Sequence, residues 1–208
     1  MANTTFKGTL RTEGGYSSIA TATGTGTETT QMSISSAGFA SLDANKLATE
    51  AGTGITGGTG TIYRSSVIRE GGIIKTSILI DLTGLRSTAS GDIIGVDGTS
   101  NVCHIGQITA ARNGTILAGR MTCFEAPAGG DPDINVHSAT EGTGVEDGAI
   151  SGLTETILVD SGDLAVGTIV TFTGVPAADE FLYLTLGATT NADYTAGKLL
   201  IELFGYEA

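Results

Sequence analysis

The sequence predicts an all-β protein, a jelly-roll-like two-sheet β-sandwich with an extended N-terminal arm. Three observations support this prediction. The 208 residues include 32 glycines and 33 threonines, two residue types that disfavour helices. After residue 60, short segments with alternating apolar and polar residues follow one another. Glycine-containing turn sequences separate these segments, and about eight such strands in one domain suit a sandwich of two sheets.

Residues 1–60 are predicted to form the arm, and residues 61–208 the sandwich domain. Within the first part, the stretches 20–27 and 52–60 consist mainly of glycine and threonine. A segment so poor in large apolar residues does not build a core of its own. We therefore expect either a flexible tail or an arm that becomes ordered on a neighbouring subunit.

The segment 73–82 opens the sandwich as a half-buried strand. Its inward face is predicted to carry Ile74, Thr76, Ile78, Ile80 and Leu82. Polar residues alternate with them on the other face, and the turn sequences Thr83-Gly84 and Ser90-Gly91 follow.

Asn113-Gly114 lies between two apolar-rich runs and predicts a hairpin with a two-residue loop, because a type I′ turn needs positive φ at both central residues. In that register His104 faces Cys123, and Cys103 points to the opposite face of the hairpin. A disulfide between the two cysteines is then geometrically excluded. Two buried thiols are typical of a protein made in a reducing cytoplasm.

Five further strands are predicted, at 134–137, 155–159, 168–173, 181–186 and 198–204. The last of them is apolar on both faces. This pattern indicates a strand in the centre of a sheet or one at a subunit interface. Leu200, Phe204 and Tyr206 are the candidate residues of that interface.

The net charge of −12 is spread unevenly along the chain. Residues 1–120 contain nine basic and eight acidic residues, whereas residues 121–208 contain one and fourteen. We expect no nucleic-acid partner, because that affinity rests on Lys and Arg contacts with phosphate. Apolar runs of only a few residues predict no membrane span. The first residues also lack the basic and apolar regions of a secretion signal.

Few motifs in the sequence carry chemistry. Residues 52–57 fit G-x-G-x-x-G, but a strand pattern follows where a helix should begin, so we interpret them as a linker. Asp131 and Asp133 have the spacing that opens a calcium loop, yet later positions lack the required Gly and Glu. His104 is interpreted as a core histidine and not as half of a zinc site. We expect no cofactor, no metal and no enzymatic activity.

Several segments resemble a family of structural proteins of marine tailed bacteriophages. They are DLTGL at 81–85, GDIIG at 91–95, HIGQIT at 104–109 and YTAGKLLIELFGY at 194–206, together with the opening residues 1–8. The resemblance covers most of residues 61–206 and concerns fold motifs. It implies a virion component that is made in the host cytoplasm and binds the outer surface of the capsid as a decoration or cement protein. The implied partners are the major capsid protein and further copies of the chain.

A decoration protein would use the arm to add a strand to a capsid subunit. The candidate contact residues are Phe6, Lys7, Leu10, Arg11, Tyr16 and Ile19. The acidic residues after position 120 would face outward and oppose aggregation of particles. Sandwich subunits on a lattice often assemble around a three-fold axis, so we expect a homotrimer.

Three other functions stay open at this point. A tail- or fibre-associated protein could bind host surface polysaccharide through stacking on Tyr63, Tyr183, Tyr194 or Tyr206, although each suits a core or an interface equally well. A polysaccharide-degrading enzyme is disfavoured, because the chain has two histidines and shows no acid–base constellation. A bacterial cytoplasmic β protein unrelated to any virus is disfavoured by the arm and by the motifs above.

Overall fold

The computed structural model describes residues 16–21, 28–34, 40–42, 49–188 and 192–207. The chain divides into two compact units, Met1–Leu47 and Ala48–Ala208. The first unit contains an antiparallel sheet of three strands in the order β1-β2-β3. These strands are β1 (Tyr16–Thr21), β2 (Glu28–Ile34) and β3 (Ala40–Leu42). Their backbones are described and their side chains are not.

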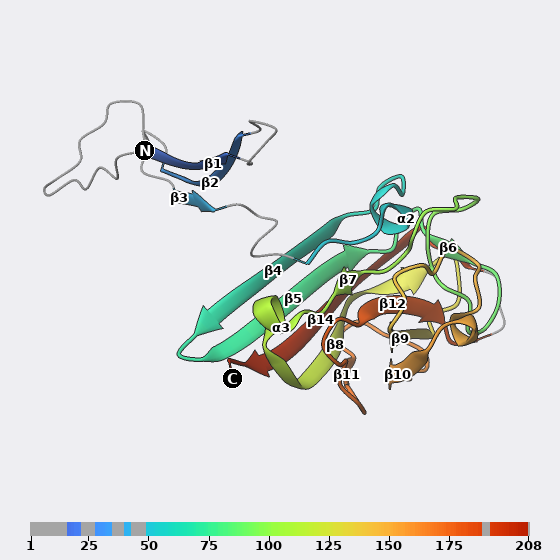
Figure 1. Cartoon of the computed structure of the whole chain (residues 1–208). Helices are drawn as coiled ribbons and strands as arrows, with labels where there is room; N and C mark the ends of the chain where they lie inside the picture. The colour runs from blue at the N-terminus through green and yellow to red at the C-terminus, as the bar shows by residue number, and fades with distance from the viewer. Residues whose placement is uncertain (1–15, 22–27, 35–39, 43–48, 189–191, 208) are drawn as a thin grey trace, which may run out of the picture. The chain divides into compact units, whose positions relative to one another are not determined.

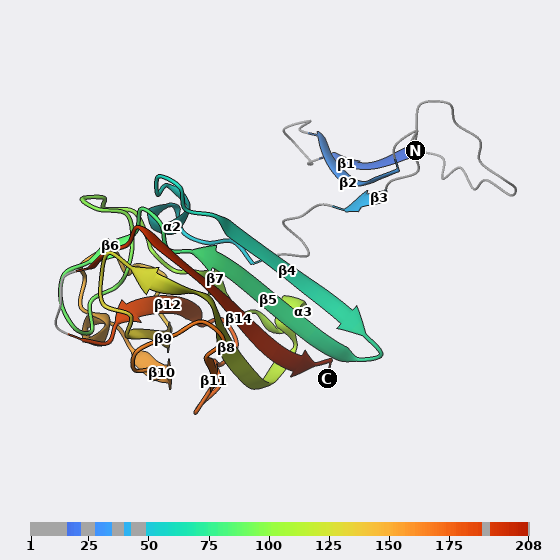
Figure 2. The same cartoon turned by 180° about the vertical axis from the view of Figure 1, so that it is seen from behind.

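The second unit is an all-β sandwich of two antiparallel sheets, as the sequence predicted (Figures 1 and 2). One sheet has five strands in the order β11-β8-β14-β5-β4. Its strands are β4 (Tyr63–Glu70), β5 (Ile73–Asp81), β8 (Thr115–Ala128), β11 (Ile169–Thr171) and β14 (Ala196–Tyr206). β14 lies at its centre, which confirms the prediction drawn from its two apolar faces.

The other sheet has four strands in the order β10-β9-β12-β7. Its strands are β7 (Gly106–Gln107), β9 (Ile134–Ala139), β10 (Glu155–Val159) and β12 (Phe181–Leu186). A short pair, β6 (Arg86–Ser87) with β13 (Ala192–Asp193), stands apart from both sheets. Figures 1 and 2 show the long strands β4, β5 and β14 side by side, with the shorter strands β9, β10 and β12 in a second layer.

The core lies between the two sheets. On β5, Ile74, Ile78 and Ile80 are buried together with Thr76, which confirms the predicted inward face. β14 contributes three further buried residues, Leu199, Ile201 and Leu203, and the four-stranded sheet contributes Ile134, Val136, Leu182, Leu184 and Leu186. This alternation fixes which side of each strand points inward.

Loops cover the other face of the four-stranded sheet. Every residue of β9 is buried, although its side chains alternate between the two faces. Tyr183 on β12 accepts a hydrogen bond from the Gly144 amide (3.2 Å) and donates one to the Glu141 carbonyl (2.8 Å), so the loop 140–149 lies on this face. The short 3₁₀ helix η1 (Ile150–Gly152) continues that loop.

The predicted hairpin at Asn113-Gly114 is wrong. Residues Ala110–Asn113 form a short helix, α3, and Gly114 leaves it with a φ of 67°. The Asn113 side chain is fully buried, where it accepts a hydrogen bond from the Thr109 amide (2.9 Å) and donates one to Thr76 Oγ1 (2.8 Å). These two bonds favour a helical turn over a type I′ turn. β8 consequently pairs with β14 and β11, and His104 does not face Cys123.

Both cysteines are buried and free, so the prediction of no disulfide is confirmed, although the hairpin that suggested it does not exist.

The interpretation of residues 52–57 as a linker is also wrong. They contain a short helix, α2 (Thr53–Thr56), and Ile55 is fully buried in the core. The amides of Gly52 and Gly54 donate to the carbonyls of His104 (2.8 Å) and Val102 (2.9 Å). A Cβ on either glycine would collide with this backbone. The segment therefore belongs to the sandwich unit, which begins upstream of residue 61.

Candidate interaction surface

The outer face of the five-stranded sheet is the candidate functional site, and we call it the outer face below. Alternation along β14 directs Leu200, Phe204 and Tyr206 away from the core. Leu200 and Phe204 are half-buried, and Tyr206 is 39% exposed. The three residues proposed from the sequence as interface residues thus share one face of one strand. None of the sandwich elements described above packs over this face.

Glu202 lies between Leu200 and Phe204 on the outer face and is only 3% exposed. Its carboxylate accepts a hydrogen bond from Nε of Arg120 on β8 (2.5 Å) and forms an ion pair with Lys75 on β5. The hydrogen bond from Arg120 is the main cause that lowers the pKa of Glu202 below its ordinary value. We call Lys75, Glu202 and Arg120 the cationic triad, because their formal charges sum to one positive charge.

Lys198 is the centre of a second group of three charges on the outer face. It pairs with Glu125 on β8 and with Asp81 on β5 (Nζ to Oδ2, 3.3 Å). Burial raises the pKa of Asp81, but hydrogen bonds from Thr83 and Lys198 outweigh it, so that the pKa is lower than usual. We call Asp81, Lys198 and Glu125 the anionic triad, because their formal charges sum to one negative charge.

Exposed apolar side chains accompany the two triads. Ile68 on β4 is 50% exposed, Ile73 on β5 is 54% exposed and Ile169 on β11 is 59% exposed. Phe124 is 52% exposed, at the point where the pairing of β8 with β14 shifts register. These residues stand on different strands and in different rows of the sheet, so they add apolar area to the face without forming one contiguous patch.

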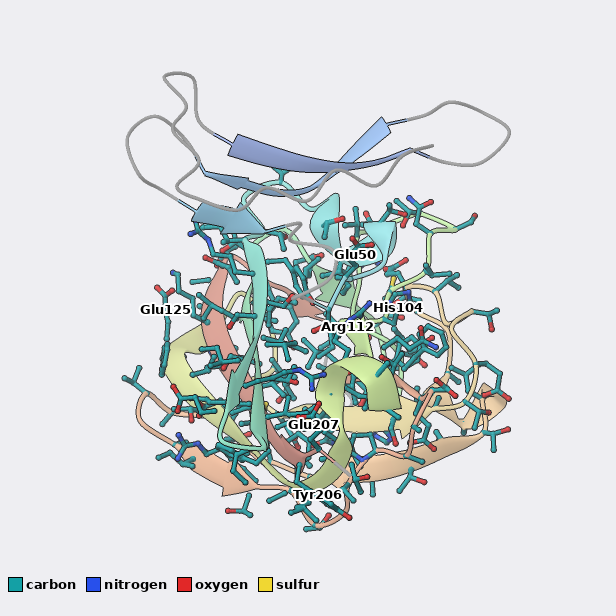
Figure 3. All side chains as sticks on the ribbon, turned by 60° about the vertical axis from the view of Figure 1, so that its left-hand side comes forward. Glu50, His104, Arg112, Glu125, Tyr206 and Glu207 are labelled. Atoms are coloured by element: carbon teal, nitrogen blue, oxygen red, sulfur yellow. The ribbon has the colours of Figure 1, made fainter. Side chains whose placement is uncertain are left out.

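The outer face is neutral on an otherwise acidic unit. Residues 49–207 contain seven basic and nineteen acidic side chains. The outer face holds four of each sign, namely Arg64, Lys75, Arg120 and Lys198 with Glu70, Asp81, Glu125 and Glu202. The net negative charge of the unit thus lies elsewhere. In Figure 3, Glu125 lies on one flank of the unit and His104 on the opposite flank.

The arm residues proposed as capsid contacts are not placed by the structure. Phe6, Lys7, Leu10 and Arg11 lie outside the described residues. Tyr16 and Ile19 belong to β1, where the backbone alone is described.

The four tyrosines considered for sugar stacking differ in exposure. The hydroxyl of Tyr63 donates to the Ile105 carbonyl (2.7 Å), and that of Tyr194 to the Asp131 carbonyl (3.0 Å). Tyr183 and Tyr194 are buried, and Tyr63 is half-buried. Of these four, Tyr206 alone offers an exposed ring, at the end of β14 in Figure 3.

His104 packs in the covered layer of the sandwich. Its ring centroid lies 5.0 Å from that of Phe181 and 6.4 Å from that of Tyr183. Burial lowers the pKa of His104. His104 is thus half-buried and packs against aromatic rings at the margin of the core, and its buried Nδ1 has no hydrogen-bond partner among the described residues, which departs from a buried, hydrogen-bonded core histidine.

Asp133 was considered for calcium binding together with Asp131. Burial is the main cause that raises the pKa of Asp133, and the nearby Asp160, Asp131 and Asp163 raise it further. Within the described part of the chain, no three His, Cys, Asp or Glu side chains converge to hold a metal ion. We therefore infer no calcium site at Asp131 and Asp133.

Sequence reasoning missed both triads. The signal that could have found them is the polar pair Lys198 and Glu202, four residues apart on one face of an otherwise apolar strand. Their partners on β5 and β8 lie far away in the sequence.

No family model, no curated protein and no solved structure matches the chain. Among the described residues, no helix has the length and apolarity that a bilayer crossing requires.

Proposed function

We propose that this chain is a non-enzymatic structural protein of a tailed-phage virion that decorates the outside of the capsid. Its partner would be the major capsid protein, and its form a jelly-roll-like body with an N-terminal arm. The segments DLTGL, GDIIG, HIGQIT and YTAGKLLIELFGY support the proposal through their resemblance to such proteins.

The observation that favours it most is the neutral outer face on an acidic unit. A protein that coats a particle needs at least one face that tolerates close contact. Its remaining surface should repel other particles, and excess negative charge does this. The outer face combines exposed apolar groups with charges that are already paired, and acidic residues predominate on the rest of the unit.

Localisation on the particle tests the proposal. Virions of the phage whose genome encodes this chain would be labelled with an antibody against the chain and imaged by electron cryomicroscopy. We expect regular density over the head that carries the label. Label confined to the tail would overturn decoration and favour the polysaccharide-binding alternative, in which Tyr206 is the exposed stacking candidate. An unlabelled virion would overturn both functions.

The first unit can be tested separately. We expect a variant that lacks residues 1–47 to retain the circular dichroism spectrum of a folded sandwich and to lose most of its affinity for purified heads. The reason is that strand addition by the arm would supply main-chain hydrogen bonds that the body cannot replace. Binding would be measured by co-sedimentation with heads, with the full chain as control. Undiminished binding of the shortened protein would contradict a role of the arm on the capsid.

A further inference from the structure

The two triads occupy neighbouring positions along the centre of the outer face. In the register of the sheet, Lys198 lies opposite Asp81 and Glu125, and Glu202 lies opposite Arg120. Lys75 reaches Glu202 from the adjoining position. Leu200 lies midway between the triads, opposite Leu79 on β5 and Thr122 on β8. A strand rises about 3.3 Å per residue, so roughly 13 Å separates Lys198 from Glu202 along β14.

We propose that the outer face binds the outer face of a second copy of this chain, related by a two-fold axis that passes across the strands at Leu200. Such an axis lies in the plane between the two sheets. It reverses the strand direction, and β5, β14 and β8 each lie over their own counterpart. Each anionic triad then faces the cationic triad of the other copy. The face is complementary to itself, as a two-fold interface requires.

The complementarity extends to single residues. Lys198 lies two residues before Leu200 and Glu202 two residues after it, so the rotation places Lys198 above Glu202 of the second copy, which Lys75 and Arg120 cover. On β8, Glu125 pairs with the 198 position and Arg120 with the 202 position. Glu125 therefore meets Arg120 of the second copy. Opposite charges that meet in this way set the register and exclude other orientations.

The paired state of both triads lowers the cost of burying them. A charge that enters an interface alone loses its hydration and gains nothing in return. Here Glu202 is already 3% exposed and bonded to two cations within its own subunit, and Lys198 is bonded to two carboxylates. The second copy therefore adds favourable contacts to charges that are already neutralised in part.

Apolar contacts on the axis add to the charge pairing. Leu200 lies on the axis and meets itself, and so does Ile169, which pairs with Thr122 and is 59% exposed. Leu79 and Arg64 lie near one end of β5 and β4, so the rotation leaves much of these two strands uncovered and the overlapping footprint is roughly 400 Å². Stable interfaces bury about 800 Å² per partner, so this dimer depends mainly on charge pairing.

Two contacts oppose the arrangement. Lys198 approaches Lys75 and Arg120, the cations that cover Glu202 of the second copy, and Arg64 meets its own copy. Arg64 on β4 pairs with Leu79 and therefore lies in the same row as the axis, so it meets its own copy. It stands on the edge strand and is exposed, where solvent and salt screen the repulsion. The surfaces outside this face carry the net negative charge, which disfavours contact between copies there.

The inference concerns the protein in solution, where a second copy and a capsid would compete for the outer face, and it replaces the three-fold assembly expected from the sequence. We expect sedimentation equilibrium of the full chain to give twice the mass of 20.9 kDa. L200D places two carboxylates on the axis and should raise the dissociation constant about 100-fold or more. I157D introduces the same charge at a 40% exposed apolar residue on β10 and should leave the dimer intact. A monomer, a homotrimer, or a dimer that L200D leaves unchanged would overturn the proposal.

Cross-linking tests the axis itself and does not require a disruptive change. In T122C the new thiol lies in the row of the axis and meets its own copy across two sheets about 10 Å apart, too far for a direct disulfide, so a short bis-maleimide reagent should join the two chains. In I73C the new thiol lies in the row of Tyr206, and the two copies of it are roughly 40 Å apart. We expect covalent dimers of T122C and none of I73C. Failure of T122C to cross-link, or equal cross-linking of I73C, would overturn the two-fold arrangement.

Discussion

At the scale of single residues, Glu202 shows how a charge can stand on a sheet face and still be nearly inaccessible. It is 3% exposed because Lys75 and Arg120 reach over it from the two neighbouring strands. A shift of β14 by one residue would turn Glu202 into the core, where an unpaired carboxylate costs several kcal/mol. The ion pairs therefore help to fix the register of the central strand.

We expect E202Q to lower the free energy of unfolding at pH 7 by about 2 kcal/mol, because it weakens hydrogen bonds to two charged groups. The folded pKa of Glu202 lies below its ordinary value, so its stabilising effect is present above that value. The effect disappears as the pH falls through the folded pKa, and wild type and variant should then converge. Urea unfolding at pH 7 and at a series of decreasing pH values measures both, with E70Q on the exposed edge strand as control. Equal losses for the two variants at pH 7 would contradict the role of the triad.

The pKa of Glu146 is shifted in the opposite direction to that of Glu202, so its charged form destabilises the folded protein. Burial is the main cause that raises its pKa, and the neighbouring Asp147 raises it further, to about 7. The carboxyl group of Glu146 therefore binds its proton more tightly in the folded protein than in the unfolded chain. Stability contributed by the protonated form is fully present below pH 4.5, the ordinary value, and is lost as the pH rises through about 7.

We therefore expect E146Q to have the stability of the wild type at pH 4 and to exceed it at pH 8 by about 1 kcal/mol, a figure reduced for the partial exposure of the residue. Urea unfolding at pH 4, 6 and 8 gives the two curves. If wild type and variant lost stability in parallel between pH 4 and pH 8, Glu146 would not be the residue responsible.

At the scale of elements, sequence periodicity predicted strands well where alternation was clear. The predicted segments 155–159 and 181–186 coincide with β10 and β12. The segment 198–204 lies within the longer β14, and its central position followed from its two apolar faces. Local sequence failed at Asn113-Gly114, because the hydrogen bond from the Asn113 side chain to Thr76 joins parts of the chain 37 residues apart. A rule that predicts turns from neighbouring residues cannot account for a contact between residues so far apart in the sequence.

The same contact makes Asn113 important for stability. N113A removes the partners of the Thr109 amide and of Thr76 Oγ1 at a fully buried position. We expect a loss of about 2–3 kcal/mol in the free energy of unfolding. N101A changes an exposed asparagine and should stay within about 0.5 kcal/mol of wild type. Chemical denaturation of wild type, N113A and N101A measures these differences in the free energy of unfolding. Similar midpoints for all three would mean that α3 does not depend on Asn113.

At the scale of the whole chain, composition predicted the all-β class. Charge counts along the sequence did not predict the neutral outer face, because Glu125, Lys198 and Glu202 of this face belong to the acidic segment 121–208. Leu200, Phe204 and Tyr206, the interface candidates, share one face because they have the same parity on a single strand, and their role in an interface stays a prediction. The triads were not predictable, since Asp81, Glu125 and Lys198 come together only through the order β8-β14-β5. The boundary between the two units, at residues 47 and 48, was not predictable from the sequence either. Gly-Thr repeats indicate a linker wherever they occur, and only the contacts of Ile55 show that this one is packed.

The packing of Ile55 gives a test of that boundary. We expect residues 48–208 to melt within a few degrees of the full chain, because this fragment keeps α2 and its hydrogen bonds to Val102 and His104. Residues 61–208 lose those bonds and the fully buried Ile55, and should be destabilised by about 3 kcal/mol or more.

I55A in the full chain provides a second comparison that does not depend on recovery of the fragment 61–208. It creates a cavity at the same place without shortening the chain and should lower the free energy of unfolding by about 2–4 kcal/mol. Thermal unfolding followed by circular dichroism measures all four proteins. If I55A and the fragment 61–208 both melted like the full chain, residues 49–60 would contribute nothing to the core. The sandwich would then begin at residue 61, as the sequence alone predicted.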